Sequence, residues 1–162
     1  MNNDVKTIIG WWGAMQPDKE DDRAALAHLR RAGTILQLCM LPQTLDLCRK
    51  LDGSKSDLGK TALIAGVLAY IRKTANGKFA GQLGSPAERP KMAPLRFQRL
   101  IEAATPDEQL TAFRRAVIQN DREANVYDLA ESLLHWGDAR RQSWLYDYYQ
   151  TSNPKSELET VP

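Results

Sequence analysis

The side chains with the most distinctive chemistry in this 162-residue chain are arginines that occur in pairs. A guanidinium group is permanently charged and presents a planar fork of N–H donors, which fits two oxygens of a phosphate at once. Arg96 and Arg99 are three residues apart, so they share one face of a helix. These side chains favour contact with a polyanion, and the alternative is that they pair with carboxylates of the same chain. The pairs are Arg30 with Arg31, Arg96 with Arg99, Arg114 with Arg115, and Arg140 with Arg141.

Positive charge is concentrated in the middle of the chain, although the net charge of the whole chain is only +2. The net charge is −3 over residues 1–22, +3 over 23–54, +6 over 55–115 and −4 over 116–162. Such a block favours a polyanionic partner, because Lys and Arg contacts release the counterions condensed on phosphates. A basic face that is merely solvated would leave the same pattern. Few aromatic residues lie in the block, so contacts to a nucleic-acid backbone would outweigh base stacking.

Residues that could catalyse a reaction or hold a metal ion do not form recognisable motifs. The two histidines, His28 and His135, belong to no metal-binding pattern. The run GKT at 59–61 resembles the end of a phosphate-binding loop, but the upstream glycine is misplaced and no strand is expected before it. Cys39 and Cys48 lack the spacing of a zinc site and are expected to be buried free thiols. We therefore expect a chain that is not an enzyme and has no cofactor or metal.

The elements that would position the arginines are predicted to be helices. Apolar residues recur with the helical period, and no segment alternates convincingly with the period of a strand. Asp57, Thr105 and Asn125 are suited to cap helix starts. We expect one all-α domain over residues 1–153, an irregular bundle of roughly eight helices, followed by a polar, disordered tail at 154–162. The expected helices cover 4–15, 23–32, 43–51, 58–75, 95–104, 105–119, 126–136 and 138–150, with a short apolar piece at 35–41.

The segments 58–75 and 77–94 differ from the others in apolar content and in glycine and proline content, respectively. The apolar segment 58–75 suggests a central helix buried on most sides that ends in the basic turn Arg72-Lys73. Six Gly and Pro residues in 77–94 predict a long loop, which is usually functional or mobile. No apolar run approaches the roughly 20 residues of a membrane-spanning helix, and no signal peptide is recognisable, so a cytoplasmic protein is expected.

Several segments resemble one known family, the CasB proteins, which are the small subunits of the type I-E CRISPR surveillance complex Cascade. The strongest match is DLAESLLHWG at 128–137, followed by an arginine and an aromatic helix. Weaker matches are WW at 11–12, ALAHLRRA at 25–32, LRFQRLIEA at 95–103 and LTAFRRAV at 110–117. The likeness covers most of the chain and is loose at 34–57.

The resemblance implies an all-α, non-catalytic subunit that is present in two copies along the belly of Cascade. These copies would brace the guide-RNA backbone built by the CasC subunits and offer a basic path for target and displaced DNA in the R-loop. The implied partners are CasA, CasC, CasD, CasE, a second copy of this chain, guide RNA and target DNA, with no membrane.

The resemblance also implies positions of nucleic-acid contact. Arg31, Arg96 and Arg115 match basic contact positions of the family, and Lys78 is a looser match because the loop differs in length. Asp138 departs from the family, since a basic residue is expected after the Trp-Gly pair, and this puts a contact at that helix start in doubt. The predicted nucleic-acid-binding residues are Arg31, Lys78, Arg96, Arg99, Arg115 and Arg141.

Two other functions fit the sequence. A purely structural subunit could dock on proteins through aromatic anchors, although filling the core is the favoured role for the same aromatic residues. A small helical DNA-binding regulator is the third reading, but no clear helix-turn-helix supports it. The candidate anchors are Trp11, Trp12, Trp144 and Tyr148.

Overall fold

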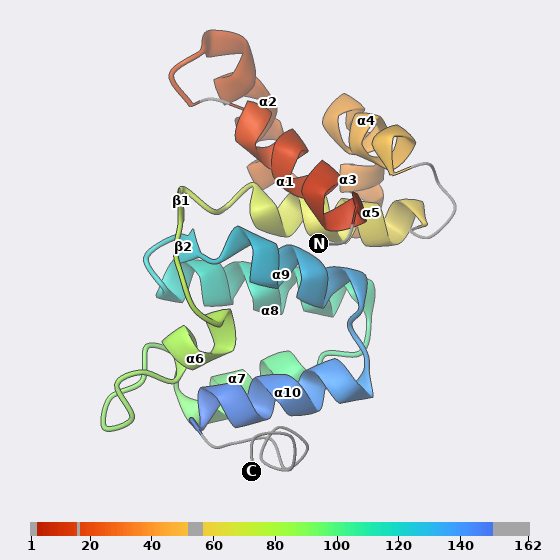
Figure 1. Ribbon diagram of the computed structural model, residues 1–162. Coiled ribbons are helices and arrows are strands. Elements are labelled where there is room, and N and C mark those ends of the chain that lie inside the picture. Colours follow the sequence, from red (N-terminus) through yellow and green to blue (C-terminus); the bar gives the residue numbers. More distant parts are fainter. Residues whose placement is uncertain (1–2, 16, 52–56, 151–162) are drawn as a thin grey trace.

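A computed structural model describes residues 3–15, 17–51 and 57–150 of the chain (Figure 1). These residues form ten helices and one pair of two-residue strands, which confirms the all-α prediction. The tail predicted at 154–162 lies outside the described residues. The elements are α1 (Asn3–Ala14), α2 (Glu20–Arg31), α3 (Ile35–Cys39), α4 (Pro42–Lys50), α5 (Leu58–Leu68), β1 (Lys73–Thr74), α6 (Phe79–Leu83), α7 (Pro94–Glu102), α8 (Pro106–Gln119), β2 (Glu123–Ala124), α9 (Val126–Leu134) and α10 (Asp138–Tyr148).

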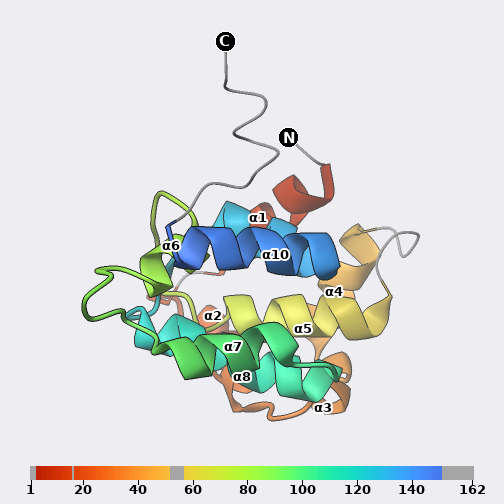
Figure 2. The same ribbon diagram turned by 90° about the horizontal axis from the view of Figure 1, so that it is seen from below.

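The helices are stacked in layers around α5. Figure 1 shows α1 to α4 above α5, then α8 and α9, and finally α6, α7 and α10. Seen from below, α7 and α8 lie next to each other on one side of the molecule (Figure 2), and α7 contacts α10 through the stacked rings of Phe97 and Tyr148. Every residue from Thr61 to Leu68 is buried, as expected for a helix that is apolar on all sides. The core is therefore continuous through the stack.

The central helix ends at Leu68, seven residues before the end predicted from its apolar run. Side chains from α1 and α2 bind the carbonyl groups at this end. Trp12 Nε1 donates to Leu68 O at 3.0 Å, and Arg30 Nε donates to Ala69 O at 2.7 Å. The chain then turns, and β1 pairs in parallel with β2, fifty residues further along. The predicted basic helix end is thus wrong, because long-range pairing replaces the last turns.

A short helix, α6, lies within the segment that the glycines and prolines predicted as a loop. Its residues Phe79, Ala80 and Leu83 are buried, and the helix packs against α10. Phe79 contacts Trp144 edge to face, with ring centroids 5.8 Å apart. Burial of these apolar side chains outweighs the weak helix propensity of the glycines.

The predicted helix caps are confirmed by their hydrogen bonds. Asp57 Oδ1 accepts from Lys60 N at 2.6 Å, Thr105 Oγ1 from Glu108 N at 3.2 Å, and Asn125 Oδ1 from Asp128 N at 3.0 Å. Each cap satisfies a backbone donor that has no partner within its helix. These caps fix where α5, α8 and α9 begin.

The aromatic residues considered as docking anchors belong to the core. Trp11, Trp144 and Tyr148 are buried, and Trp12 is half-buried. Cys39 and Cys48 are free thiols, half-buried rather than fully buried. In the part of the chain that is described, no helix combines the length and apolar character needed to cross a membrane.

Candidate nucleic-acid interface

Helix α7 exposes two of the predicted arginines on one face. Phe97, Leu100 and Ile101 form its buried side, while Arg96 and Arg99 are exposed. The sequence produces this division because positions 97, 100 and 101 share one helical stripe and positions 96 and 99 share another. The apolar stripe therefore fixes the helix with both guanidinium groups toward solvent.

Helix α8 adds a third arginine to the same surface. Arg115 is exposed, and it lines a hollow between α7 and α8 together with Arg96 and Arg99. The hollow has a volume of about 440 Å³, and its other walls include Met92, Leu100, Ala112, Ile118 and Gln119. We call Arg96, Arg99 and Arg115 the α7–α8 arginine face.

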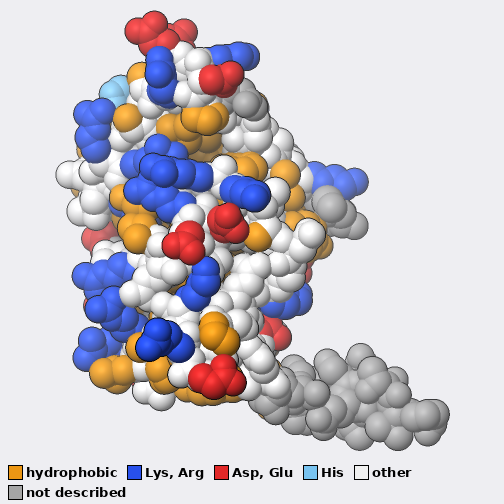
Figure 3. All heavy atoms as spheres, turned by 90° about the vertical axis from the view of Figure 1, so that its left-hand side faces the viewer, with side chains coloured by type: hydrophobic (Ala, Val, Ile, Leu, Met, Phe, Trp, Pro, Cys, Tyr) orange, Lys and Arg blue, Asp and Glu red, His pale blue; other side chains and the backbone are white. Residues whose placement is uncertain are grey.

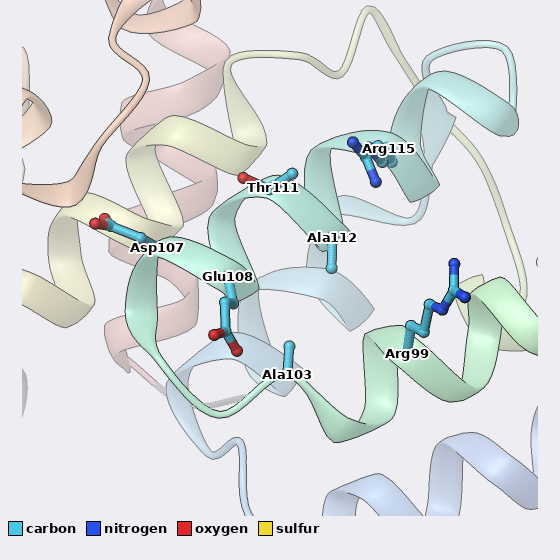
Figure 4. Close-up of a pocket in the computed structure, with 7 residues that line it drawn as sticks. All are labelled: Arg99, Ala103, Asp107, Glu108, Thr111, Ala112 and Arg115. Atoms are coloured by element: carbon cyan, nitrogen blue, oxygen red, sulfur yellow. The ribbon is translucent and has the colours of Figure 1, made fainter.

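A neighbouring hollow on this surface has positive side chains at one end and negative side chains at the other. Figure 4 shows Arg99 and Arg115 at one end and the carboxylates of Asp107 and Glu108 at the other. Both carboxylates lie in the first turn of α8, where the helix dipole favours negative charge. Asp107 Oδ1 accepts from Ile35 N at 2.8 Å, so this carboxylate is held by backbone. Among the described residues, no ion pair joins a carboxylate to the α7–α8 arginine face.

Lys78 and Arg31 lie apart from this face. Lys78 precedes α6, and its Nζ lies 3.7 Å from Oδ1 of the buried Asp128. The other oxygen of Asp128 accepts from Phe79 N at 2.9 Å, so the carboxylate links the start of α6 to α9. Arg31 is exposed at the end of α2 and lines neither hollow of the α7–α8 surface.

Arg141 is engaged within the protein. Its Nε donates to Ile101 O at 2.9 Å, its Nη1 lies 3.6 Å from Asp138 Oδ1, and its guanidinium stands over the ring of Trp136. Ile101 O is one of the last carbonyls of α7, so this contact joins α7 to α10. The preceding Arg140 pairs with Glu131 at 3.2 Å. Arg140 and Arg141 therefore both pair with carboxylates of the same chain, which is the alternative to contact with a polyanion.

Arg114 points into the core, although the next residue is exposed. It is 8% exposed and donates hydrogen bonds to the carbonyl oxygens of Leu29, Ala32 and Gly66. Leu110 and Val117 are its buried neighbours on the same helical stripe. That stripe is the sequence signal that distinguishes Arg114 from Arg115.

A second group of arginines, which the sequence analysis did not single out as a site, lies where β1 meets β2. Arg72 N donates to Arg122 O at 2.8 Å. Burial lowers the pKa of Arg30, and the positive charges of Arg122 and Arg72 lower it further. Figure 3 views the molecule from this side. It shows Lys and Arg side chains gathered at the level of the strands and again lower down, on the side of α7 and α8. No local pattern could reveal this group, because its members come from three distant segments.

The fold resembles a chain of Escherichia coli Cascade, seen in the crystal structure of that complex bound to a PAM-containing dsDNA target with a 32-nt spacer. The TM-score is 0.67, and the match covers 93% of this chain and 97% of that chain at 18% sequence identity. At this identity, the likeness concerns the fold. No curated protein matches the sequence.

A sequence profile adds a match over most of the chain. The profile described as CRISPR-associated protein Cse2 matches residues 25–149, which hold α3 to α10 and most of α2. This is the family that the resemblance identified under the name CasB, so that prediction is confirmed. The chain belongs to the Cse2 family of CRISPR-associated proteins.

Proposed function

We propose that this chain is the non-catalytic small subunit of a type I-E RNA-guided surveillance complex, Cascade, and that it contacts nucleic-acid backbone through the α7–α8 arginine face. One observation carries the second part: three exposed arginines from two helices line one hollow without a carboxylate partner in the described chain. Guanidinium groups in this arrangement suit phosphate oxygens. Membership of the Cse2 family supports the first part.

The proposed mechanism is electrostatic. In RNA-guided recognition, base pairing between guide and target reads the sequence, and the exchange of one duplex for another is nearly balanced. Contacts to backbone phosphates can therefore tip the balance toward the R-loop. Arg96, Arg99 and Arg115 would supply such contacts to target or displaced DNA, and the subunit would also brace the guide RNA. The proposed protein partners are CasA, CasC, CasD, CasE and a second copy of this chain, in the cytoplasm.

The triple variant Arg96→Gln, Arg99→Gln, Arg115→Gln tests this proposal. If each side chain contacts one phosphate, the slope of log affinity against log salt for duplex DNA should fall by about 3 in magnitude. Affinity should fall equally for unrelated sequences, because backbone contacts carry no sequence information. Fluorescence anisotropy of labelled duplexes over a salt series measures both quantities.

A charge-matched control separates specific contacts from the loss of net charge. Lys6→Gln, Arg49→Gln, Lys50→Gln also removes three exposed positive charges, from α1 and α4. This control should retain most of the salt slope. Equal slopes in the two triple variants would contradict a contact role for the α7–α8 arginine face.

A protein-docking function is favoured by a different surface. Leu36 and Met40, in and just after α3, are 71% and 66% exposed, and Leu45 of α4 is 39% exposed. Exposed apolar side chains that cluster often mark a protein contact. If the arginine triple variant left DNA affinity unchanged while Leu36→Ser, Met40→Ser blocked incorporation into reconstituted Cascade, the docking function would replace nucleic-acid contact as the main role.

A further inference from the structure

Three arginines converge at the end of the small parallel strand pair. The register pairs Lys73 with Glu123, so the preceding residues, Arg72 and Arg122, lie side by side. Arg30 approaches from α2, held by its Nε bond to Ala69 O at 2.7 Å. Tyr70 lies among them, since its hydroxyl donates to Arg30 O at 3.0 Å and the Arg122 guanidinium stands over its ring. We call Arg30, Arg72 and Arg122 the strand-end arginine cluster.

The charges of this cluster are not balanced within the described chain. Burial lowers the pKa of the Arg30 guanidinium, and the positive charges of Arg122 and Arg72 lower it further. No ion pair among the described residues joins the cluster to a carboxylate. The nearby Asp121 directs its carboxylate to Lys91 Nζ, 2.9 Å away. An anion bound here would relieve the repulsion between the arginines.

The backbone around Arg122 is also strained. Asp121 and Arg122 have φ angles of 59° and 58°, in the left-handed region that glycine occupies most easily. Two consecutive non-glycine residues in this region cost stability, and such strain is often concentrated at functional sites. Arg122 therefore occupies a backbone conformation that glycine would adopt at lower cost, and its positive charge repels that of Arg30.

The cluster borders an open hollow with room for a ligand. The hollow has a volume of about 520 Å³ and is lined in part by Arg23, Arg30 and Arg72, with Trp12, Leu26 and Ile71 among its apolar walls. No carboxylate occurs among the described residues that line it. A phosphodiester group, which has one negative charge and two unesterified oxygens, suits cationic donors on the rim of such a hollow.

We infer that the strand-end arginine cluster binds a backbone phosphate of a nucleic-acid strand, at a second position separate from the α7–α8 arginine face. The inference rests on the proposed function, because it assumes that the chain contacts nucleic acid. Figure 3 shows Lys and Arg side chains gathered at two levels of one face, so a single strand could follow basic side chains from the level of the strands to the side of α7 and α8. Arg72 and Arg122 would contact the phosphate, and Arg30 would add charge beneath it.

The test is the double variant Arg72→Gln, Arg122→Gly in the full chain. Its affinity for a labelled oligo-dT strand should fall about tenfold, as expected for loss of a charge-assisted contact. The salt slope should fall by about 0.7 in magnitude for one lost single-strand phosphate. Because glycine removes the strain at position 122, the variant should melt at the same temperature as the parent chain or higher. A purely structural role for Arg122 would instead lower the melting temperature.

Three further measurements make the outcomes distinct. Arg49→Gln, Lys50→Gln removes two charges elsewhere and should bind the strand nearly as the parent does. If the cluster variant binds like this control while the α7–α8 triple variant is weakened, the inference fails and the proposed function stands. If the parent chain shows no salt-dependent binding of DNA, both fail. If the cluster variant loses thermal stabilisation by inorganic phosphate but keeps its affinity for oligo-dT, the site takes free phosphate and the inference is overturned.

Discussion

Replacing Arg114 with methionine is expected to lower the free energy of unfolding by about 3 kcal/mol, although its neighbour Arg115 can be replaced at little cost. The buried guanidinium binds the carbonyl oxygens of Leu29, Ala32 and Gly66, with Nη2 and Nε contacts of 2.8 Å and 3.0 Å to the first and last. Methionine fills similar space but donates no hydrogen bond. Each carbonyl left buried without a partner costs about 1–3 kcal/mol.

The position of these carbonyls explains why the charge is needed. Leu29 O belongs to the last turn of α2, and Gly66 O belongs to the last turn of α5. Both helix ends carry partial negative charge and lack backbone donors. Arg114 therefore neutralises two helix ends at once, and its guanidinium also stands over the ring of Tyr70, 4.7 Å from the ring centroid. Burial lowers the pKa of Arg114, and these contacts offset the cost of burying its charge.

Urea denaturation of the two variants measures the difference. Arg115→Met is the matched control, and its free energy of unfolding should remain within about 0.5 kcal/mol of the parent. Arg114→Lys should lie between the two, because an ammonium group retains the charge but cannot reach three carbonyls with a planar fork. Equal stability of Arg114→Met and Arg115→Met would contradict the role of Arg114 in capping the ends of α2 and α5.

Local features of the fold could be predicted from the sequence because local chemistry determines them. Thr105 and Asn125 start helices through hydrogen bonds to residues three positions ahead, so the capping pattern in the sequence contains both partners. The exposed face of α7 follows equally from the spacing of its apolar residues.

Features that depend on distant segments could not be predicted in this way. Helix α5 ends at Leu68 because Trp12 and Arg30 bind its terminal carbonyls and β1 pairs with β2. Helix α6 forms because α10 covers it, in a segment whose own composition predicts a loop. The same distinction applies to the candidate site. The face shared by Arg96 and Arg99 follows from their spacing within one helix, whereas Arg72 meets Arg122 through a tertiary contact between distant segments.

Replacing Gly84, at the end of α6, with alanine is expected to lower the free energy of unfolding, whereas replacing Gly81, within α6, is expected to raise it. A Cβ atom at Gly84 would lie 2.0 Å from Tyr148 O and 2.8 Å from the carbonyl carbon of Tyr148. These are backbone atoms at the end of α10, so they cannot move aside as a flexible side chain could. At Gly81, the corresponding atom would lie 3.5 Å from Asp147 O, which is an ordinary van der Waals contact.

Gly84→Ala should therefore lower the free energy of unfolding by about 3 kcal/mol, at the upper end of the range for overpacking a core. Separating α6 from α10 would also disturb the contact of Phe79 with Trp144. Gly81→Ala should raise the free energy of unfolding by up to about 1 kcal/mol, because alanine loses less conformational entropy in a helix. Urea denaturation monitored by tryptophan fluorescence measures both values. Similar stability of the two variants would mean that α6 can move away from α10 without loss, in which case the close approach at Gly84 does not hold this part of the fold together.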